Sequence, residues 1–278
     1  MTSEAILPIR EPGPADSDAL PPGAIALRDI QVQRGPNHIL RGLSLTLEPG
    51  AISVIVGPSG VGKSTLMGVL NGLLRPHAGT VTISGLGRLD DPAVLREHRR
   101  RTATVFQEHA LIERLSALDN VLLGMADARH PLSPLPWPRA LQERAAQALL
   151  EVGLLHRANA RTGTLSGGER QRVGIARAMV RRPRLTLGDE PFSAVDPALT
   201  QQLGDTLRHL VSANGISVVL VLHQLEVARR LADRIIGLAD GQVAFDGPAE
   251  TFDLAAQSRL FPIPGRHAPS HPPTSTES

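Results

Sequence analysis

The chain has 278 residues, of which 41% are hydrophobic and 20% are charged; this is ordinary for a globular protein and sufficient for a buried core. It contains no cysteine, which excludes disulfides and cysteine-ligated metals. The formal net charge is only +2 and the basic runs are short and lack aromatic neighbours, so we expect no nucleic-acid partner. There is neither a secretory signal nor an apolar run of about 18 residues, the length needed to cross a membrane, so we expect a cytosolic protein.

The two ends of the chain differ in composition from the rest. Residues 1–22 are rich in proline, alanine and acidic residues, and residues 263–278 are rich in proline, serine and threonine. Such segments have too few core residues to repay the entropy lost on ordering. The sequence therefore predicts two disordered tails that flank the folded part.

Lys63 is the only lysine of the chain, and it completes the pattern G-x-x-x-x-G-K-S in GPSGVGKST (57–65). The strand-like run AISVIV (51–56) precedes this loop, and the helix-like run STLMGVLNGLL (64–74) follows Lys63. In such a loop the backbone N–H groups surround phosphates, a compact ammonium contacts the β- and γ-phosphates, and the Ser64 hydroxyl binds Mg²⁺. The predicted nucleotide-binding residues are Gly57, Pro58, Ser59, Gly60, Val61, Gly62, Lys63, Ser64 and Thr65.

A second strand with a terminal acid is expected in a P-loop fold. The run RLTLGDEPFSAVD (184–196) supplies it, because its apolar part ends in Asp189 and Glu190 before a proline. We expect Asp189 to hold Mg²⁺ and Glu190 to polarise the attacking water. The residues Thr186 and Gly188 interrupt the apolar run, which predicts a weaker strand than usual.

Two further strand-like runs end in polar residues. The strand expected within TATVFQEH (102–109) ends at Gln107, and the strand expected within GISVVLVLHQ (215–224) ends at His223. Parallel strands present their carboxyl ends to the ligand, so both side chains are candidates for the same site. A different stretch, LSGGERQRV (165–173), has small residues before a predicted helix and is typical of a further phosphate-binding turn.

Taken in order, GPSGVGKS, Gln107, LSGGERQRV, LTLGDEP, SAVD and His223 resemble the motif set of the ABC-transporter ATP-binding subunits over roughly residues 23 to 260. The resemblance implies a head-to-tail homodimer in which each ATP lies between the P-loop of one chain and the LSGG turn of the other. It assigns Ser166, Gly167 and Gly168 to the ATP of the partner chain, and Asp196 to the loop that crosses the dimer. This arrangement would explain two phosphate-binding turns in one chain.

The same resemblance implies roles for three residues of the site. Glu190 would act as general base, His223 would contact the γ-phosphate, and Gln107 would ligate Mg²⁺ and couple the site to the membrane partner. In the family an aromatic ring stacks on adenine from the segment that corresponds to QVQRGPNHIL (31–40), which contains no aromatic ring here apart from histidine. Arg34 stands at that position, where its guanidinium either stacks on the base or remains solvated.

A closer resemblance is to the phosphonate-import ATP-binding subunits. It rests on NGLLRPHAGTV, ALDNVLLG, the single Trp137 and the run LHQLEVARRLADRIIGLADGQVAFDGP (222–248), in which LHQ replaces THD. The resemblance implies separate membrane permease subunits, an extracytoplasmic solute-binding protein and a peripheral location on the cytoplasmic face of the inner membrane. Import of phosphite, a phosphate-like anion or a polar amino acid is the open alternative, and a soluble ABC ATPase acting on nucleic acid is a distant one.

The expected fold is α/β: a P-loop NTPase core with a mostly parallel sheet, an N-terminal antiparallel β layer and an inserted α-helical subdomain. The predicted core is discontinuous and comprises residues 23–107 and 165–262, and the helical subdomain comprises residues 108–164. Within that subdomain, RALQERAAQALLEVGLL (139–155) has helical periodicity. ALIERLSALDNVLLG (110–124) is expected to form the groove that receives a helix of the membrane subunit.

Overall fold

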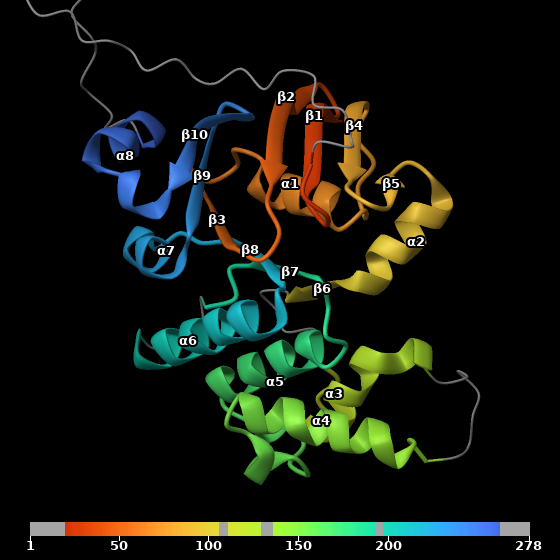
Figure 1. Ribbon diagram of the computed structural model, residues 1–278. Helices are drawn as coiled ribbons and strands as arrows, with labels where there is room; N and C mark the ends of the chain where they lie inside the picture. Colours follow the sequence, from red (N-terminus) through yellow and green to blue (C-terminus); the bar gives the residue numbers. More distant parts are fainter. Residues whose placement is uncertain (1–19, 106–110, 129–135, 193–196, 262–278) are drawn as a thin grey trace, which may run out of the picture.

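The computed structural model describes residues 20–105, 111–128, 136–192 and 197–261, which form two β-sheets and a set of helices. In Figure 1 the strands occupy the upper part of the molecule and a group of helices lies below them. The predicted α/β class is confirmed, with a mixed larger sheet and an antiparallel smaller one.

The larger sheet has six strands, all parallel except at one edge. Their order is β10 (Gln242–Pro248), β9 (Arg234–Ala239), β3 (Ile52–Val56), β8 (Ser217–Val221), β7 (Leu185–Asp189) and β6 (Thr102–Val105). Only β10 runs antiparallel to its neighbour. All five residues of β3 are buried, as expected for a central strand with both faces covered. Because the other five strands are parallel, their carboxyl ends meet at one edge.

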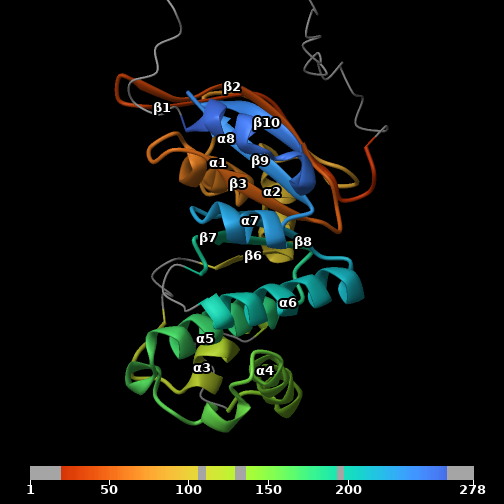
Figure 2. The same cartoon turned by 90° about the vertical axis from the view of Figure 1, so that its left-hand side faces the viewer.

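The smaller sheet is antiparallel and has the order β2 (Asn37–Leu47), β1 (Ile25–Arg34), β4 (Ala78–Ile83) and β5 (Gly87–Arg88). Helix α1 (Lys63–Leu70) packs between the two sheets, where Leu66 shares a core cluster with Leu27 of β1 and Ile236 of β9. Figure 2 shows this sheet as the uppermost layer, above α1 and β3. The antiparallel layer predicted for the N-terminal part is therefore present.

Helix α1 is shorter than the predicted stretch 64–74. It ends at Leu70, and Asn71 accepts a hydrogen bond from the Leu73 N–H at 2.9 Å through its side-chain oxygen. Gly72 follows in the left-handed region, with φ of 69°. The apolar pattern continues beyond this point, but a side-chain-stabilised turn replaces the last helical turn and leaves Leu73 67% exposed.

Three helices pack against one another below the larger sheet: α3 (Ala117–Leu122), α4 (Arg139–Glu151) and α5 (Gly167–Met179). Within the segment 110–124, α3 begins at Ala117, because Ser116 is its N-cap and accepts from the Asp119 N–H at 3.0 Å. Residues 111–115 are irregular, and the buried Asn120 amide bonds both the N–H and the C=O of Ile112. The helix predicted over 139–155 ends at Glu151.

The remaining helices complete the layers around the sheet. They are α2 (Pro92–Arg101), α6 (Pro197–Asn214), α7 (Leu225–Leu231) and α8 (Leu254–Leu260), with the 3₁₀ turns η2 (Leu123–Ala128), η3 (Leu155–Arg157), η4 (Thr162–Thr164) and η5 (Ala249–Thr251). Side chains alternate across β3, so Val54 and Val56 join the core of α5, α6 and α7, whereas Ile55 joins the core of α1. β7 is well integrated despite its predicted weakness, because it pairs with strands on both sides.

Candidate functional site

The P-loop lies at the carboxyl edge of the larger sheet, between the buried strand β3 and helix α1. Gly57 follows directly after β3 and has φ of 152°, a conformation that favours glycine. A Cβ atom at this position would lie 2.4 Å from the Leu238 carbonyl oxygen of β9. The absence of a side chain therefore lets the loop turn directly over the sheet edge, where its backbone is available to a ligand.

Lys63 begins α1 and its side chain folds back over the loop. Its Nζ donates to the carbonyl oxygens of Gly57 and Pro58, both at 2.8 Å, and the residue is only 6% exposed. Burial lowers the pKa of Lys63, and the charges of Glu190 and Asp189 oppose this shift. The neighbouring Ser64 is exposed, so its hydroxyl faces the same open side of the loop as a potential ligand.

The predicted carboxylates lie at the same edge as the P-loop. Asp189 is the last residue of β7 and pairs with Val221 of β8, and the Glu190 N–H donates to the Val221 carbonyl oxygen at 3.1 Å. Glu190 has φ of 50°, which is uncommon for a residue with a side chain and is often found at functional sites. Its Oε1 lies 2.6 Å from Nε2 of His223, which follows β8.

The structure thus brings Lys63, Ser64, Asp189, Glu190 and His223 to one edge, because the loops after β3, β7 and β8 are neighbours there. The last described residue of β6, Val105, lies next to Gly188 at that edge. Two predicted site residues, Gln107 and Asp196, lie outside the described residues.

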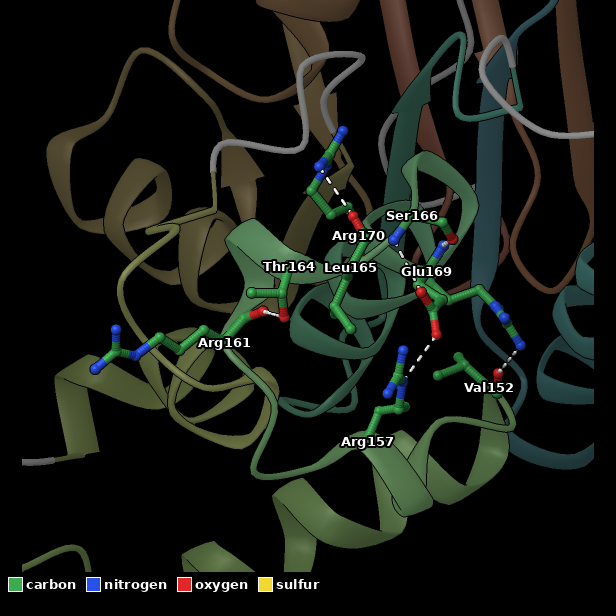
Figure 3. A network of polar contacts seen from close by, with 9 residues as sticks. Val152, Arg157, Arg161, Thr164, Leu165, Ser166, Glu169 and Arg170 are labelled. Carbon is green, nitrogen blue, oxygen red and sulfur yellow. Dashed lines mark hydrogen bonds and ion pairs between the residues drawn. The ribbon is translucent and has the colours of Figure 1, made fainter.

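The LSGG turn is not part of this cluster. Ser166 is the N-cap of α5, and Gly167 and Gly168 are the first two residues of that helix. Figures 1 and 2 both place α5 among the lower helices and α1 between the sheets, so one chain does not bring the two phosphate-binding turns together. Figure 3 shows the polar contacts around the turn, which include a reciprocal capping box between Ser166 and Glu169.

A cavity of about 350 Å³ lies beside the P-loop. It is lined by P-loop residues 58–61, by His38, Ile39 and Arg41 of β2, by the β9–β10 turn and by Arg259 and Leu260 of α8. Arg34 is exposed at the end of β1 and is not among the lining residues. No sequence pattern indicated this cavity, because its lining depends on how β2 packs against the turn at Gly241, where the Arg41 N–H donates to the Gly241 carbonyl oxygen at 3.0 Å.

The family model described as ABC transporter matches residues 40–193. The chain is 57% identical over 256 residues to the phosphonates import ATP-binding protein PhnC 2 of Rhodopseudomonas palustris, covering 92% of this chain and 90% of that protein. The chain belongs to the ABC transporter family. It is also 47% identical to the phosphite import ATP-binding protein PxtA of Stutzerimonas stutzeri, with 86% and 88% of the two chains covered.

Solved structures of ABC cassettes have the same fold. The dimeric ADP- and Pi-bound cassette MJ0796 matches with a TM-score of 0.71 at 33% identity, over 81% of this chain and 98% of that one. As a member of this family, the chain is an ATP-binding subunit that hydrolyses ATP for transport. Membership also implies membrane permease partners and dimerisation of the ATP-binding subunits. Within the part of the chain that the structure describes, no helix is long and apolar enough to span a bilayer.

The residues of the ABC cassette fit ATP and Mg²⁺. The P-loop offers a backbone turn and a buried ammonium, which together suit a polyphosphate. Ser64 and Asp189 offer oxygen ligands, the type that Mg²⁺ prefers. The described residues contain no cluster of three metal-binding histidine, cysteine, aspartate or glutamate side chains.

Proposed function

We propose that this ABC ATPase drives the import of phosphonates through separate permease subunits that receive the solute from an extracytoplasmic binding protein. The 57% identity to a phosphonate-import ATP-binding protein supports this solute. The LHQ sequence at 222–224, noted above as typical of that subfamily, is a second, independent support. The 47% identity to a phosphite-import protein makes phosphite the second candidate.

The P-loop residues 57–65 hold the phosphates of ATP in this proposal. Lys63 exchanges its contacts with the Gly57 and Pro58 carbonyls for phosphate oxygens, because both of those contacts are made by a rotatable ammonium. The Ser64 hydroxyl and the Asp189 carboxylate hold Mg²⁺, with Gln107 as a further oxygen ligand. The bound ion neutralises charge on the phosphate oxygens during transfer. The adenine end occupies either the cavity beside the P-loop, against His38 and Ile39, or the exposed end of β1, where Arg34 stacks on it.

The 2.6 Å contact between Glu190 and His223, at the same edge as Lys63, is the observation that carries the catalytic assignment. Glu190 accepts the proton of the attacking water, because an ionised carboxylate has acceptor capacity beyond its one contact with His223. His223 contacts the first carboxylate oxygen through Nε2 in the open site, and its Nε2–H exchanges that carboxylate for the γ-phosphate when the site closes. Both residues come from loops at strand ends, which place them against the ligand.

The site is completed by a second copy of the chain. Ser166, Gly167 and Gly168 bind the γ-phosphate of the partner's ATP, because the first N–H groups of a helix have no acceptor within the helix. The position of this turn away from the P-loop of its own chain supports an arrangement in trans. Asp196 then belongs to the segment that crosses between the two copies.

The variant Glu190→Gln tests the shared site. It should bind Mg-ATP, lose turnover and accumulate as a dimer in sedimentation velocity, because the amide cannot accept the proton while the γ-phosphate remains between the chains. The control Glu143→Gln removes an exposed carboxylate of α4 and should remain monomeric at the same ATP concentration. A Glu190→Gln chain that stays monomeric at saturating Mg-ATP would contradict the shared site.

The transported solute is tested by reconstitution. Proteoliposomes that contain this chain with a phosphonate permease and its binding protein should take up a phosphonate when ATP is supplied to the ATPase side. Faster uptake of phosphite than of any phosphonate would favour the second candidate. ATPase stimulation by DNA or RNA, with none by permease, would overturn the importer assignment.

A further inference from the structure

The LSGG turn is held by an acidic side chain, Glu169, at the third position of α5. Its Oε2 accepts from the Ser166 N–H at 2.8 Å, and its Oε1 accepts from the Arg157 Nε–H at 3.1 Å. In return, Oγ of Ser166 accepts from the Glu169 N–H at 3.2 Å. Figure 3 shows Arg157 approaching Glu169 from below, out of the 3₁₀ turn η3. Two segments of the helical region therefore meet at this one carboxylate.

This arrangement has one favourable consequence for an anion. Since Oγ of Ser166 already accepts a hydrogen bond, its own proton remains available as a donor. The N–H groups of Gly167 and Gly168, at the first two positions of the helix, lack intrahelical acceptors. The turn can thus offer hydroxyl and backbone donors together, in an orientation that the capping box fixes.

The same arrangement has one unfavourable consequence. The Glu169 side chain is only 16% exposed, so water screens its charge poorly. The Ser166 N–H and Arg157 hold the pKa of Glu169 below its usual range, so the carboxylate is ionised at neutral pH. An ionised carboxylate in the first turn would repel the γ-phosphate that the turn is proposed to bind. Arg157 is the cation in direct contact with that carboxylate.

We propose that Arg157 is a positioning residue for the ATP shared between two copies of this chain. It neutralises Glu169 and fixes it against Ser166, so that the turn presents its donors to the γ-phosphate without an uncompensated negative charge. This inference rests on the proposed function, because it requires the shared site. It assigns an electrostatic role to a residue of the turn after α4 that lies outside every recognised motif of the sequence.

The test uses ATP-driven dimerisation in the Glu190→Gln chain, measured by sedimentation at several protein concentrations. Adding Arg157→Gln should raise the dimer dissociation constant about tenfold or more, because each dimer contains two such turns. A tenfold increase corresponds to about 1.4 kcal/mol of lost dimerisation free energy. Arg157→Lys, which keeps the positive charge, should recover most of the loss. Adding Glu169→Gln to Arg157→Gln should also restore dimerisation, because the glutamine can still accept from Ser166 but carries no charge.

A matched control is available in the same helical region. Arg139 and Glu143 form an ion pair with a similar distance, 3.0 Å, but their side chains are 93% and 66% exposed. Arg139→Gln should leave the dimer dissociation constant unchanged. Thermal unfolding of each variant without nucleotide separates a loss of fold stability from a loss of ATP-driven dimerisation.

The outcomes separate the two proposals. If Glu190→Gln alone does not dimerise with Mg-ATP, the shared site is wrong and this inference falls with it. If Glu190→Gln dimerises and Arg157→Gln changes nothing, only the role of Arg157 is wrong. If Arg157→Gln weakens the dimer but Glu169→Gln restores nothing, charge compensation is not the cause and the inference is equally overturned.

Discussion

The substitution Gly57→Ala should destabilise the fold through a clash between backbone and Cβ. Gly57 has φ of 152°, and holding alanine there costs about 1–3 kcal/mol of conformational strain. The added Cβ would also lie 2.4 Å from the Leu238 carbonyl oxygen, which cannot rotate away because β9 is paired with β3 and β10. Forcing such a contact apart costs about 1–3 kcal/mol more. The sum is about 4 kcal/mol, which lowers the thermal midpoint by about 10 °C in a chain of this size.

Gly60→Ala is the matched control in the same loop. Gly60 has φ of 79°, but a Cβ there would meet no atom within 4 Å, so only the left-handed backbone cost of about 1–2 kcal/mol remains. Thermal unfolding followed by circular dichroism, without nucleotide, measures both variants free of ligand effects. The two midpoints should differ by at least about 5 °C. Equal losses in the two variants would refute the argument from the Leu238 contact.

Two further predictions concern a buried histidine of α2 and the proposed adenine end of the site. His98 of α2 is 3% exposed, and its Nε2 donates to the Leu70 carbonyl oxygen at the end of α1 at 2.7 Å. Burial lowers the pKa of His98, so the unfolded chain takes up the proton at a higher pH than the folded chain. The free energy of unfolding therefore falls as the pH drops below about 6.5, by at most about 1.4 kcal/mol per pH unit. The variant His98→Gln keeps an N–H donor, so its thermal midpoint should fall less between pH 7 and pH 5 than the midpoint of the parent chain. Midpoints that fall equally with pH in the two proteins would contradict this. Arg34→Tyr should tighten ATP binding about fivefold in calorimetry, about 1 kcal/mol of added base stacking. Unchanged affinity would place the base against His38 and Ile39 instead.

The edge of the sheet that carries the site could be predicted from the sequence, because each of its strands is a short apolar run that stops at a chemically distinctive residue. Lys63, Asp189 and His223 each follow such a run, and parallel pairing alone brings them to one edge. The contact between Glu190 and His223 needs a positive φ at Glu190, which no local pattern indicates. Its geometry comes from the pairing of β7 with β8.

The ends of two helices could not be predicted from periodicity, since side chains decide them. The apolar pattern continues past Leu70, yet the Asn71 side chain bonds the Leu73 N–H and closes a turn. In the segment 110–124, Ser116 sets the start of α3, and buried Asn120 holds the preceding residues 111–115 in an irregular form. Both features rely on polar atoms that a hydrophobic pattern does not register.

The domain boundary predicted between residues 164 and 165 falls between two segments that contact each other through Arg157 and Glu169. The LSGG motif was grouped with the ATPase core because of its phosphate chemistry, whereas α5, which begins there, packs against α3 and α4. An ion pair then ties its first turn to η3, the segment that follows α4. A displacement of the helical region must therefore carry the donors of Ser166 with it. If this turn binds the partner's γ-phosphate, closure of the dimer moves α3, α4 and α5 together, and the Arg157–Glu169 contact is one further link between η3 and the turn.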